Sequence, residues 1–309
     1  MTDFTTLTVY LGSSGHARDV FKNAAVALGQ EIGRRNKKLV YGGMDAGLMG
    51  ILANEALAAG AYVTGVVPKT LKDSERIHPS LSQTILVNTL WERKRKMFKR
   101  AQAIVSLPGG FGTLDESLEV LYWGALGLHN KPLALLNVED YWNTIIEFIS
   151  TLPDFDPKYL IVADTLDDLF AQLEQWQYPE EKEDDETGLP HFEEEILEST
   201  HEPLIFKDAT VKSAYFLITA IGLKQLGRHD RPIGILNDKG QWDGLTVWFE
   251  LAEKEAFITS KCRQLMDIET SEAALQARLA AQKPVHIDLH NEKWGPSETR
   301  THIEIKEKK

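Results

Sequence analysis

The chain has 309 residues, with 34 basic and 46 acidic side chains and a formal net charge of -12. This balance disfavours nonspecific nucleic-acid binding, which needs a basic surface, but small anions can still bind backbone amides. The one cysteine, Cys262, excludes a disulfide framework and favours a reducing, cytoplasmic environment. We expect neither a signal peptide nor a membrane span, because no run approaches ~18 consecutive apolar residues.

Short apolar runs alternate with helical patterns through the first half of the chain. Strands are predicted at residues 7–11, 38–41, 61–67, 84–87, 103–107 and 133–137, and helices at about 17–35, 47–59, 90–102 and 114–126. Gly60 is a plausible C-cap for the second helix. This alternation predicts an α/β fold, a parallel sheet with helices on both faces.

An acidic run, EEKEDDE at 180–186, has the composition of a linker and suggests a domain boundary. We expect a first domain at 1–178, an acidic linker at 179–195, a second unit at 196–290 and a charged tail at 291–309.

The second unit contains a degenerate partial repeat of the first. With an offset of 100, GLHNKPLALLN at 127–137 aligns without a gap with GRHDRPIGILN at 227–237, and Trp142 aligns with Trp242. The equivalent turn histidines, His129 and His229, suggest a structural role. Upstream, Asp208-Ala209-Thr210 stands opposite Pro108-Gly109-Gly110, and Phe216 opposite Glu116. The repeat therefore keeps the structural unit but lacks the glycines and the acid.

Three glycine-rich turns follow three predicted strands, at 12–15 (GSSG), 42–50 (GGMDAGLMG) and 108–113 (PGGFGT). Such turns gather at one edge of a parallel sheet, where helix N-termini favour anions. The expected phosphate- or nucleotide-binding residues are Gly12, Ser13, Ser14, Gly42, Gly43, Gly109, Gly110, Gly112 and Thr113. For the first turn alone, Ser13 or Ser14 could simply cap the next helix. No dinucleotide fingerprint or GxxxxGK[ST] loop supports NAD or ATP binding.

Glu116 has two interpretations. Thr113 and Glu116 match a capping box, with Thr113 as N-cap and Glu116 as the N3 residue. Alternatively, Glu116 lies beside the phosphate site, where the helix dipole favours its ionised form, and binds sugar hydroxyls or orients a water molecule. Asp115 points about 100° away around the helix, so we expect it to lie outside the site.

Arg93 belongs to a basic run at 92–100, ERKRKMFKR. This run is either a solvated helix face or a source of one inward arginine whose planar fork holds a phosphate. Lys94 need not face the same way as Arg93. Trp91 lies beside Arg93 and is a possible ligand contact. The histidines show no metal pattern, and His286 and His290 form only a weak, strand-like HxxxH pair.

The first ~175 residues resemble the LONELY GUY (LOG) family of cytokinin-activating phosphoribohydrolases, formerly described as lysine decarboxylases. The family's PGGxGTxxE motif is present as PGGFGTLDE at 108–116. Its GSSxG turn resembles residues 12–16 in a shifted register, its YGGGxxGLMG segment resembles 41–50 with Met44 for the third glycine, and its MHxRKxxM helix resembles 90–97.

The resemblance implies a Rossmann-like fold and hydrolysis of a nucleoside 5′-monophosphate, such as AMP or a cytokinin riboside monophosphate, to free base and ribose 5-phosphate. It implies Glu116 and Arg93 as the catalytic pair, Trp91 and Met97 near the base pocket, and no metal or cofactor. It also implies a homodimer. Trp91 and Leu90 replace the family's usual His and Met, so base specificity is open.

Of two other functions, the first is not supported by the sequence and the second stays open. A pyridoxal-phosphate decarboxylase needs a Schiff-base lysine, and no lysine falls in a turn that matches a cofactor pocket. A nucleotide-binding carrier or regulatory protein could use the same phosphate site without turnover. We expect the second unit to be a catalytically inactive module that packs on the apolar helix at 114–126 as a pseudo-subunit, or extends a homodimer interface.

Overall fold

The computed structural model describes residues 4–69, 77–176, 188–198 and 201–292. The acidic run at 180–186 and all but the first two residues of the expected tail lie outside the described residues. Within the described ranges, no helix is both long enough and apolar enough to cross a membrane.

Seven parallel strands form the larger sheet, in the order β4-β3-β2-β1-β5-β6-β7. They are β1 (Thr6–Tyr10), β2 (Lys38–Tyr41), β3 (Val63–Pro68), β4 (Gln83–Val87), β5 (Ala103–Ser106), β6 (Leu133–Leu136) and β7 (Leu160–Ala163). The central strands are buried apolar runs, as expected for a parallel sheet covered on both faces. The α/β prediction is confirmed, and β7 is a strand that the sequence analysis missed.

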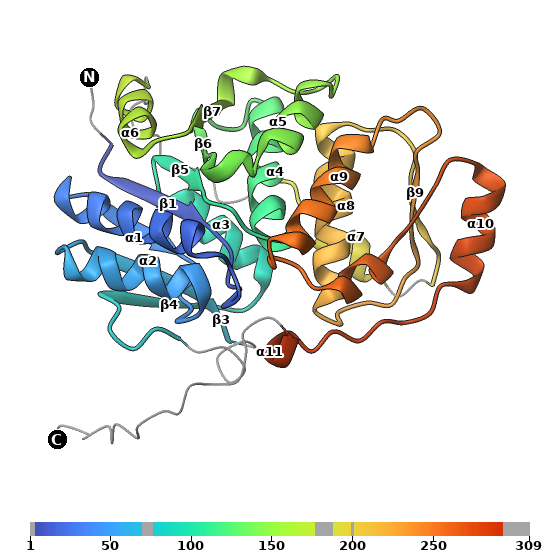
Figure 1. Ribbon diagram of the computed structural model, residues 1–309, viewed down its shortest axis with the longest axis horizontal. Helices are drawn as coiled ribbons and strands as arrows, with labels where there is room; N and C mark the ends of the chain where they lie inside the picture. The colour runs from blue at the N-terminus through green and yellow to red at the C-terminus, as the bar shows by residue number, and fades with distance from the viewer. Residues whose placement is uncertain (1–3, 70–76, 177–187, 199–200, 293–309) are drawn as a thin grey trace.

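The helices of the first unit are α1 (Asp19–Arg34), α2 (Gly47–Ala58), α3 (Leu90–Arg100), α4 (Phe111–Ala125), α5 (Asn143–Ser150) and α6 (Leu166–Gln175), with the short 3₁₀ turns η2 (Val138–Asp140) and η3 (Pro157–Tyr159). α1 and α2 pack together on one face of the sheet, away from α3 and α4 (Figure 1). The direction of strand addition reverses between β1 and β5. In open α/β sheets, that reversal is where ligands bind.

The second unit is built on a smaller parallel sheet in the order β10-β9-β8. Its elements are α7 (Glu193–Leu197), β8 (Leu204–Phe206), α8 (Val211–Gln225), β9 (Ile233–Leu236), α9 (Asp243–Lys254), η4 (Ser260–Leu265), β10 (Asp267–Glu269), α10 (Glu272–Ala281) and α11 (Leu289–Glu292). It lies beside the first unit, and α4 and α8 are neighbours at the centre of the molecule (Figure 1).

The internal repeat is structural as well as sequential. α8 and β9 begin and end 100 residues after α4 and β6. In both units a turn histidine donates through Nε2 to a helix carbonyl, and an asparagine side chain accepts from a tryptophan amide. The pairs are His129 with Val120, His229 with Ala220, Asn137 with Trp142, and Asn237 with Trp242. The structural role expected for the two histidines is confirmed.

The two units meet through their helices, with α4 against α8 and α5 against α9. Three apolar side chains of α4 are buried, Leu118, Leu121 and Tyr122, whereas Leu126, which follows the helix, is 49% exposed. The apolar face of α4 is therefore covered within the chain.

Candidate functional site

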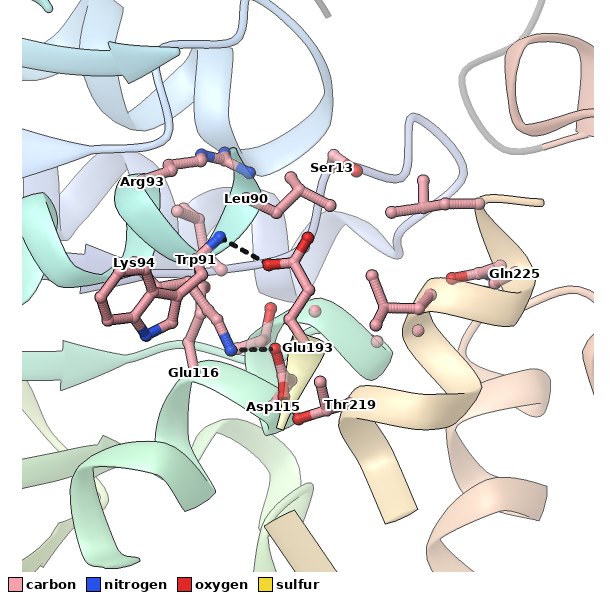
Figure 2. Close-up of a pocket in the computed structure, with 18 of the residues that line it drawn as sticks. Ser13, Leu90, Trp91, Arg93, Lys94, Asp115, Glu116, Glu193, Thr219 and Gln225 are labelled. Atoms are coloured by element: carbon pink, nitrogen blue, oxygen red, sulfur yellow. Dashed lines mark hydrogen bonds and ion pairs between the residues drawn. The ribbon is translucent and has the colours of Figure 1, made fainter. Parts of the chain in front are cut away.

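A cavity of about 150 Å³ opens beside the ends of β1 and β5 and is closed on its other side by α8 (Figure 2). Among its lining residues are the expected Gly12, Ser13, Trp91, Arg93, Gly110, Gly112, Thr113 and Glu116. Leu90, which the resemblance placed near the base pocket, also lines the cavity. Further lining residues were not expected there, among them Lys94, Asp115, His191, Glu193, Tyr215, Thr219, Gly222, Leu223 and Gln225.

The glycine turns approach one another closely, and side chains would prevent this. The Gly12 amide donates to the Pro108 carbonyl at 3.2 Å. A Cβ atom on Gly109 would lie 2.9 Å from the Gly12 nitrogen and 2.1 Å from the Thr113 hydroxyl. A Cβ atom on Gly47, whose φ is +52°, would lie 2.5 Å from the Ser13 carbonyl carbon. The convergence expected for the three turns is therefore present, and glycine is sterically required at these contacts.

The N-terminus of α4 faces the cavity. Gly110 is its N-cap, no side chain within the described residues accepts a hydrogen bond from its first amides, and Gly110, Gly112 and Thr113 line the cavity. The free N–H groups and the positive end of the helix dipole make this a suitable place for a phosphate. The predicted capping box is wrong: α4 begins at Phe111, three residues earlier than that pattern requires, so Thr113 is the third helical residue and Glu116 the sixth.

Four expected phosphate-binding residues lie behind the cavity wall rather than on it: Ser14, Gly42, Gly43 and Gly109. The Ser14 hydroxyl accepts from the His16 amide, and Arg18 is the N-cap of α1 without a side-chain cap. Capping of α1 by a serine is therefore wrong as well. Gly43 has φ of +80°, and its carbonyl accepts from the His78 amide at 3.0 Å.

Gly42 makes room for Arg93. The guanidinium of Arg93 donates to the carbonyls of Gly42 and Val66, each at 3.2 Å. A Cβ atom on Gly42 would lie only 1.9 Å from Nη2 of Arg93. Two backbone carbonyls thus fix the guanidinium at the cavity (Figure 2), and the interpretation of this helix as a purely solvated face is wrong.

Glu116 is 6% exposed and lines the cavity one helical turn beyond the α4 amides. Burial raises the pKa of its carboxyl to about 7, the Arg93 guanidinium opposes that rise, and Asp115 adds to it. The sequence analysis expected the helix dipole to favour the ionised form. That effect falls off beyond the first turn, and Glu116 lies past it, so desolvation outweighs the dipole.

Beside Glu116 lies a buried ion-pair cluster that the sequence analysis did not place at the site. Lys94 Nζ is 2.8 Å from Asp115 Oδ2 and 3.0 Å from Glu119 Oε1. Burial alone would lower the pKa of Lys94, but the two carboxylates outweigh it and hold that pKa well above its usual value. Burial also raises the pKa of Glu119 to about 7. Asp115 therefore belongs to the site, contrary to expectation (Figure 2).

Trp91 lines the cavity, but its ring is already stacked. The imidazole of His191 lies 4.1 Å from it, and the Arg95 guanidinium lies 4.7 Å from its centroid. The backbone amide of Trp91 donates to Glu193 Oε2 at 3.0 Å. Met97, which was also expected near the base, lies instead in the core, 1% exposed and away from the cavity.

The residues missed by the sequence analysis come from two sources. Lys94 and Asp115 could have been predicted from the sequence, because both adjoin expected site residues and have opposite charges. Tyr215 and Thr219 stand 100 residues after Asp115 and Glu119, so the internal repeat was the sequence feature that could have pointed to them. His191 and Glu193 follow the acidic run and had no such signal.

The described residues contain no group of three or more His, Cys, Asp or Glu side chains arranged to hold a metal ion. The predicted strand-like HxxxH pair is wrong in conformation, because the segment from Leu289 to Glu292 is helical.

The chain is similar to known proteins over its first unit. A family model described as "Possible lysine decarboxylase" matches residues 49–173. The cytokinin riboside 5′-monophosphate phosphoribohydrolase LOG1 of Arabidopsis thaliana is 43% identical over 146 residues, which are 47% of this chain and 68% of that protein. The probable cytokinin riboside 5′-monophosphate phosphoribohydrolase LOGL2 of Oryza sativa subsp. japonica is 37% identical over 185 residues, which are 58% of this chain and 76% of that protein.

Among solved structures, the molybdenum cofactor carrier protein of Chlamydomonas reinhardtii has a TM-score of 0.46 at 22% identity, covering 56% of this chain and 97% of that one. The molybdenum cofactor binding protein of Rippkaea orientalis has a TM-score of 0.43 at 19% identity, covering 56% and 96%. Because the Arabidopsis and rice relatives match at 43% and 37% identity over more than two thirds of their own length, the chain belongs to the LOG family of cytokinin riboside 5′-monophosphate phosphoribohydrolases.

Proposed function

We propose that this protein hydrolyses the N-glycosidic bond of a nucleoside 5′-monophosphate, such as AMP or a cytokinin riboside monophosphate, and releases free base and ribose 5-phosphate. The observation that carries the proposal is one cavity that combines open α4 amides, a fixed guanidinium and a buried carboxyl of raised pKa. Membership of the LOG family supports it.

The α4 N-terminus suits the 5′-phosphate. In the part of the chain that the structure describes, the amides around Gly112 and Thr113 have no side-chain acceptor, so an anion can accept their hydrogen bonds. Glu116 lies four residues beyond Gly112, which is about 6 Å along the helix. A nucleotide with its phosphate at the helix end therefore has its ribose near the Glu116 carboxyl.

Glu116 is the proposed general base. The bond between C1′ and the base nitrogen breaks, its electron pair stays with the base, which takes up a proton from solvent, and a water oxygen bonds to C1′. Glu116 accepts a proton from that water, and its negative charge stabilises the oxocarbenium-like transition state. A pKa of about 7 places this carboxyl near the range in which a general base is most effective.

Arg93 is the proposed electrostatic anchor. Its guanidinium is held by two carbonyls and lines the cavity, so its charge is available to the nucleotide without further ordering. Gly12, Ser13 and Gly110 are proposed to complete the phosphate-binding wall, with Gly42, Gly43, Ser14 and Gly109 shaping it from behind. Trp91 is proposed to border the base.

The charged state of Lys94 argues against lysine decarboxylase activity, which the description of the family model names. A Schiff base forms from a neutral amine, whereas Asp115 and Glu119 hold the Lys94 ammonium in its charged form. Lys94 instead balances the acids beside Glu116.

The test is release of free base from a panel of nucleoside 5′-monophosphates, separated by chromatography, with the matching nucleosides as controls. We expect release from at least one monophosphate and none from nucleosides, which lack the phosphate. Tight nucleotide binding without base release would instead identify a carrier or regulatory protein.

The homodimer and the cytoplasmic location expected from the sequence stay predictions. Light scattering on the purified chain addresses the first, and fractionation of the source cells the second. The arrangement of α4 and α8 bears directly on the homodimer.

A further inference from the structure

The contact between α4 and α8 is reciprocal at the level of single side chains. At the 100-residue offset, Tyr215 is the equivalent of Asp115, and Thr219 is the equivalent of Glu119. The Tyr215 hydroxyl donates to Glu119, and the Thr219 hydroxyl donates to Asp115 at 2.5 Å. Each position thus contacts the equivalent of the other. A two-fold axis between identical subunits produces this exchange.

The neighbouring helices follow the same relation. α5 packs against its own equivalent, α9. The ring centroids of Phe148 and Trp242 lie 5.9 Å apart, and a Cβ atom on Gly244 would lie 2.8 Å from Cβ of Phe148, so glycine allows the close approach. The two units are therefore arranged like the halves of a symmetric dimer, although they belong to one chain.

Of the two equivalent sites, the described residues leave one open and fill the other. Three residues that line the cavity have bulky equivalents: Gly112 corresponds to Lys212, Glu116 to Phe216 and Gly222 to Tyr122. Phe192 packs among these equivalents, with its ring centroid 4.6 Å from that of Phe216 and 5.8 Å from that of Tyr122, and 5.9 Å from Nζ of Lys212. Aromatic packing fills the second position.

The open site depends on α8 for one of its walls. Tyr215, Thr219, Gly222 and Gln225 of α8 line the cavity, and Figure 2 shows Thr219 beside Asp115 at the Lys94 ion pair. A Cβ atom on Gly222 would meet no atom within 4 Å, so this position faces open space. The first unit alone would leave the cavity unwalled on this side.

We propose that the C-terminal unit is a built-in second subunit. It covers the α4 face that another copy of the chain would otherwise contact, and α8 completes the single nucleotide pocket. The chain is then a functional monomer with one site. Only the identity of the ligand rests on the proposed function.

The first test is the mass of the full-length protein in solution, measured by sedimentation over roughly a hundredfold range of concentration. A monomer of 34.8 kDa at every concentration is expected. A concentration-dependent or stable dimer would overturn the proposal, whatever the outcome of any activity assay.

The second test places a side chain in the cavity from α8. Gly222→Leu improves helix propensity, so the fold should be kept, but the leucine should project into the pocket. We expect AMP affinity, measured by calorimetry, to fall at least about tenfold. Lys212→Leu is the matched control, because it introduces the same residue at an exposed position near the opposite end of α8, away from the open cavity, and should leave affinity unchanged.

Unchanged affinity in Gly222→Leu, or two nucleotides bound per wild-type chain, would overturn the role of α8 as a pocket wall. Failure of the wild-type chain to bind any nucleoside monophosphate would instead contradict the proposed function. The mass measurement would then still decide whether the second unit replaces a second subunit.

Discussion

α4 and α8 have the same length and occupy equivalent positions in the two units, yet the first backbone amides of the two helices differ in their hydrogen bonding. The first amides of α4 have no side-chain acceptor and open into the cavity. Those of α8 are all occupied: Thr210 and Ser213 form a reciprocal capping box, and the Asp154 carboxylate accepts from the amides of Val211 and Lys212. Asp154 holds the place that an anionic ligand would take.

The comparison separates what the fold requires from what the chemistry requires. Both units keep the turn glycine, the histidine brace and the asparagine contact to tryptophan, because these hold helix to strand. Only the first unit keeps free amides and a carboxyl at the sixth position of the helix. A helix–turn–strand unit can therefore persist for packing alone, since fold does not imply function.

The largest expected effect comes from Glu116→Gln. The amide keeps the shape of the side chain but cannot accept the proton of the attacking water, so kcat should fall at least about 100-fold. Base release measured by chromatography checks this. Because glutamine carries no charge in its buried position, the variant should also be more stable than the wild type at pH 8. Activity within a few-fold of that of the wild type would mean that the Glu116 carboxyl takes no part in catalysis, like the Phe216 side chain at the equivalent position.

Arg93 should follow. Lysine keeps the charge but cannot reach the Gly42 and Val66 carbonyls in the same fork, so Arg93→Lys should lose about tenfold to 100-fold in kcat/KM. Arg100→Lys is the matched control, since Arg100 is an exposed residue at the other end of α3. Equal activity of the Arg93 and Arg100 variants would mean that the guanidinium has no part in the reaction.

Stability should depend on pH through the buried carboxyls of α4. The pKa values of Glu116 and Glu119 are raised from 4.5 to about 7 in the folded chain, so the native state holds their protons more tightly than the unfolded state. Their contribution is fully present below pH 4.5 and is lost as pH rises through 7. Each is worth at most about 3 kcal/mol.

Urea unfolding of the wild type and Glu116→Gln at pH 5, 6.5 and 8 measures this directly. The free energy of unfolding of the variant should gain on the wild type as pH rises. A constant difference between the two proteins across this range would show that the Glu116 carboxyl has an ordinary pKa. The groups that surround the two acids are Tyr10, Arg93, Lys94, Asp115 and Tyr215.

Much of the architecture could be predicted from the sequence, because it depends on local patterns. Strand runs such as Ala103–Ser106 are short and almost entirely apolar, and three of them are followed by glycine-rich turns. β7 was missed because its four residues, Leu160–Ala163, follow a 3₁₀ turn and carry no glycine signal. The repeat was visible because its turn residues must satisfy the same hydrogen bonds in both units.

The site was predictable where backbone geometry defines it and unpredictable where distant elements meet. Gly110, Gly112 and Glu116 share one helix end, so their spacing was sufficient. The capping box was misplaced because a TxxE pattern does not reveal that Phe111 and Gly112 are already helical. His191 stacks on Trp91 although the two residues are 100 positions apart in the sequence, and only tertiary packing creates this contact.

The smallest expected effect tests the filled end of α8. Asp154→Ala removes the side-chain acceptor for the first two backbone amides of α8. Loss of such a cap costs about 1 kcal/mol, so the melting temperature should fall by a few degrees. Asp156→Ala, which removes an exposed cap on the short turn η3, is the control and should cost less. The freed amides should still bind no nucleotide, because Phe192 and Phe216 fill the space beside them and Asp208-Ala209-Thr210 replaces the Pro108-Gly109-Gly110 turn of α4. Calorimetry with AMP should therefore give one site per chain for Asp154→Ala, as for the wild type. A second site in this variant would mean that the aspartate alone separates the inactive unit from the active one.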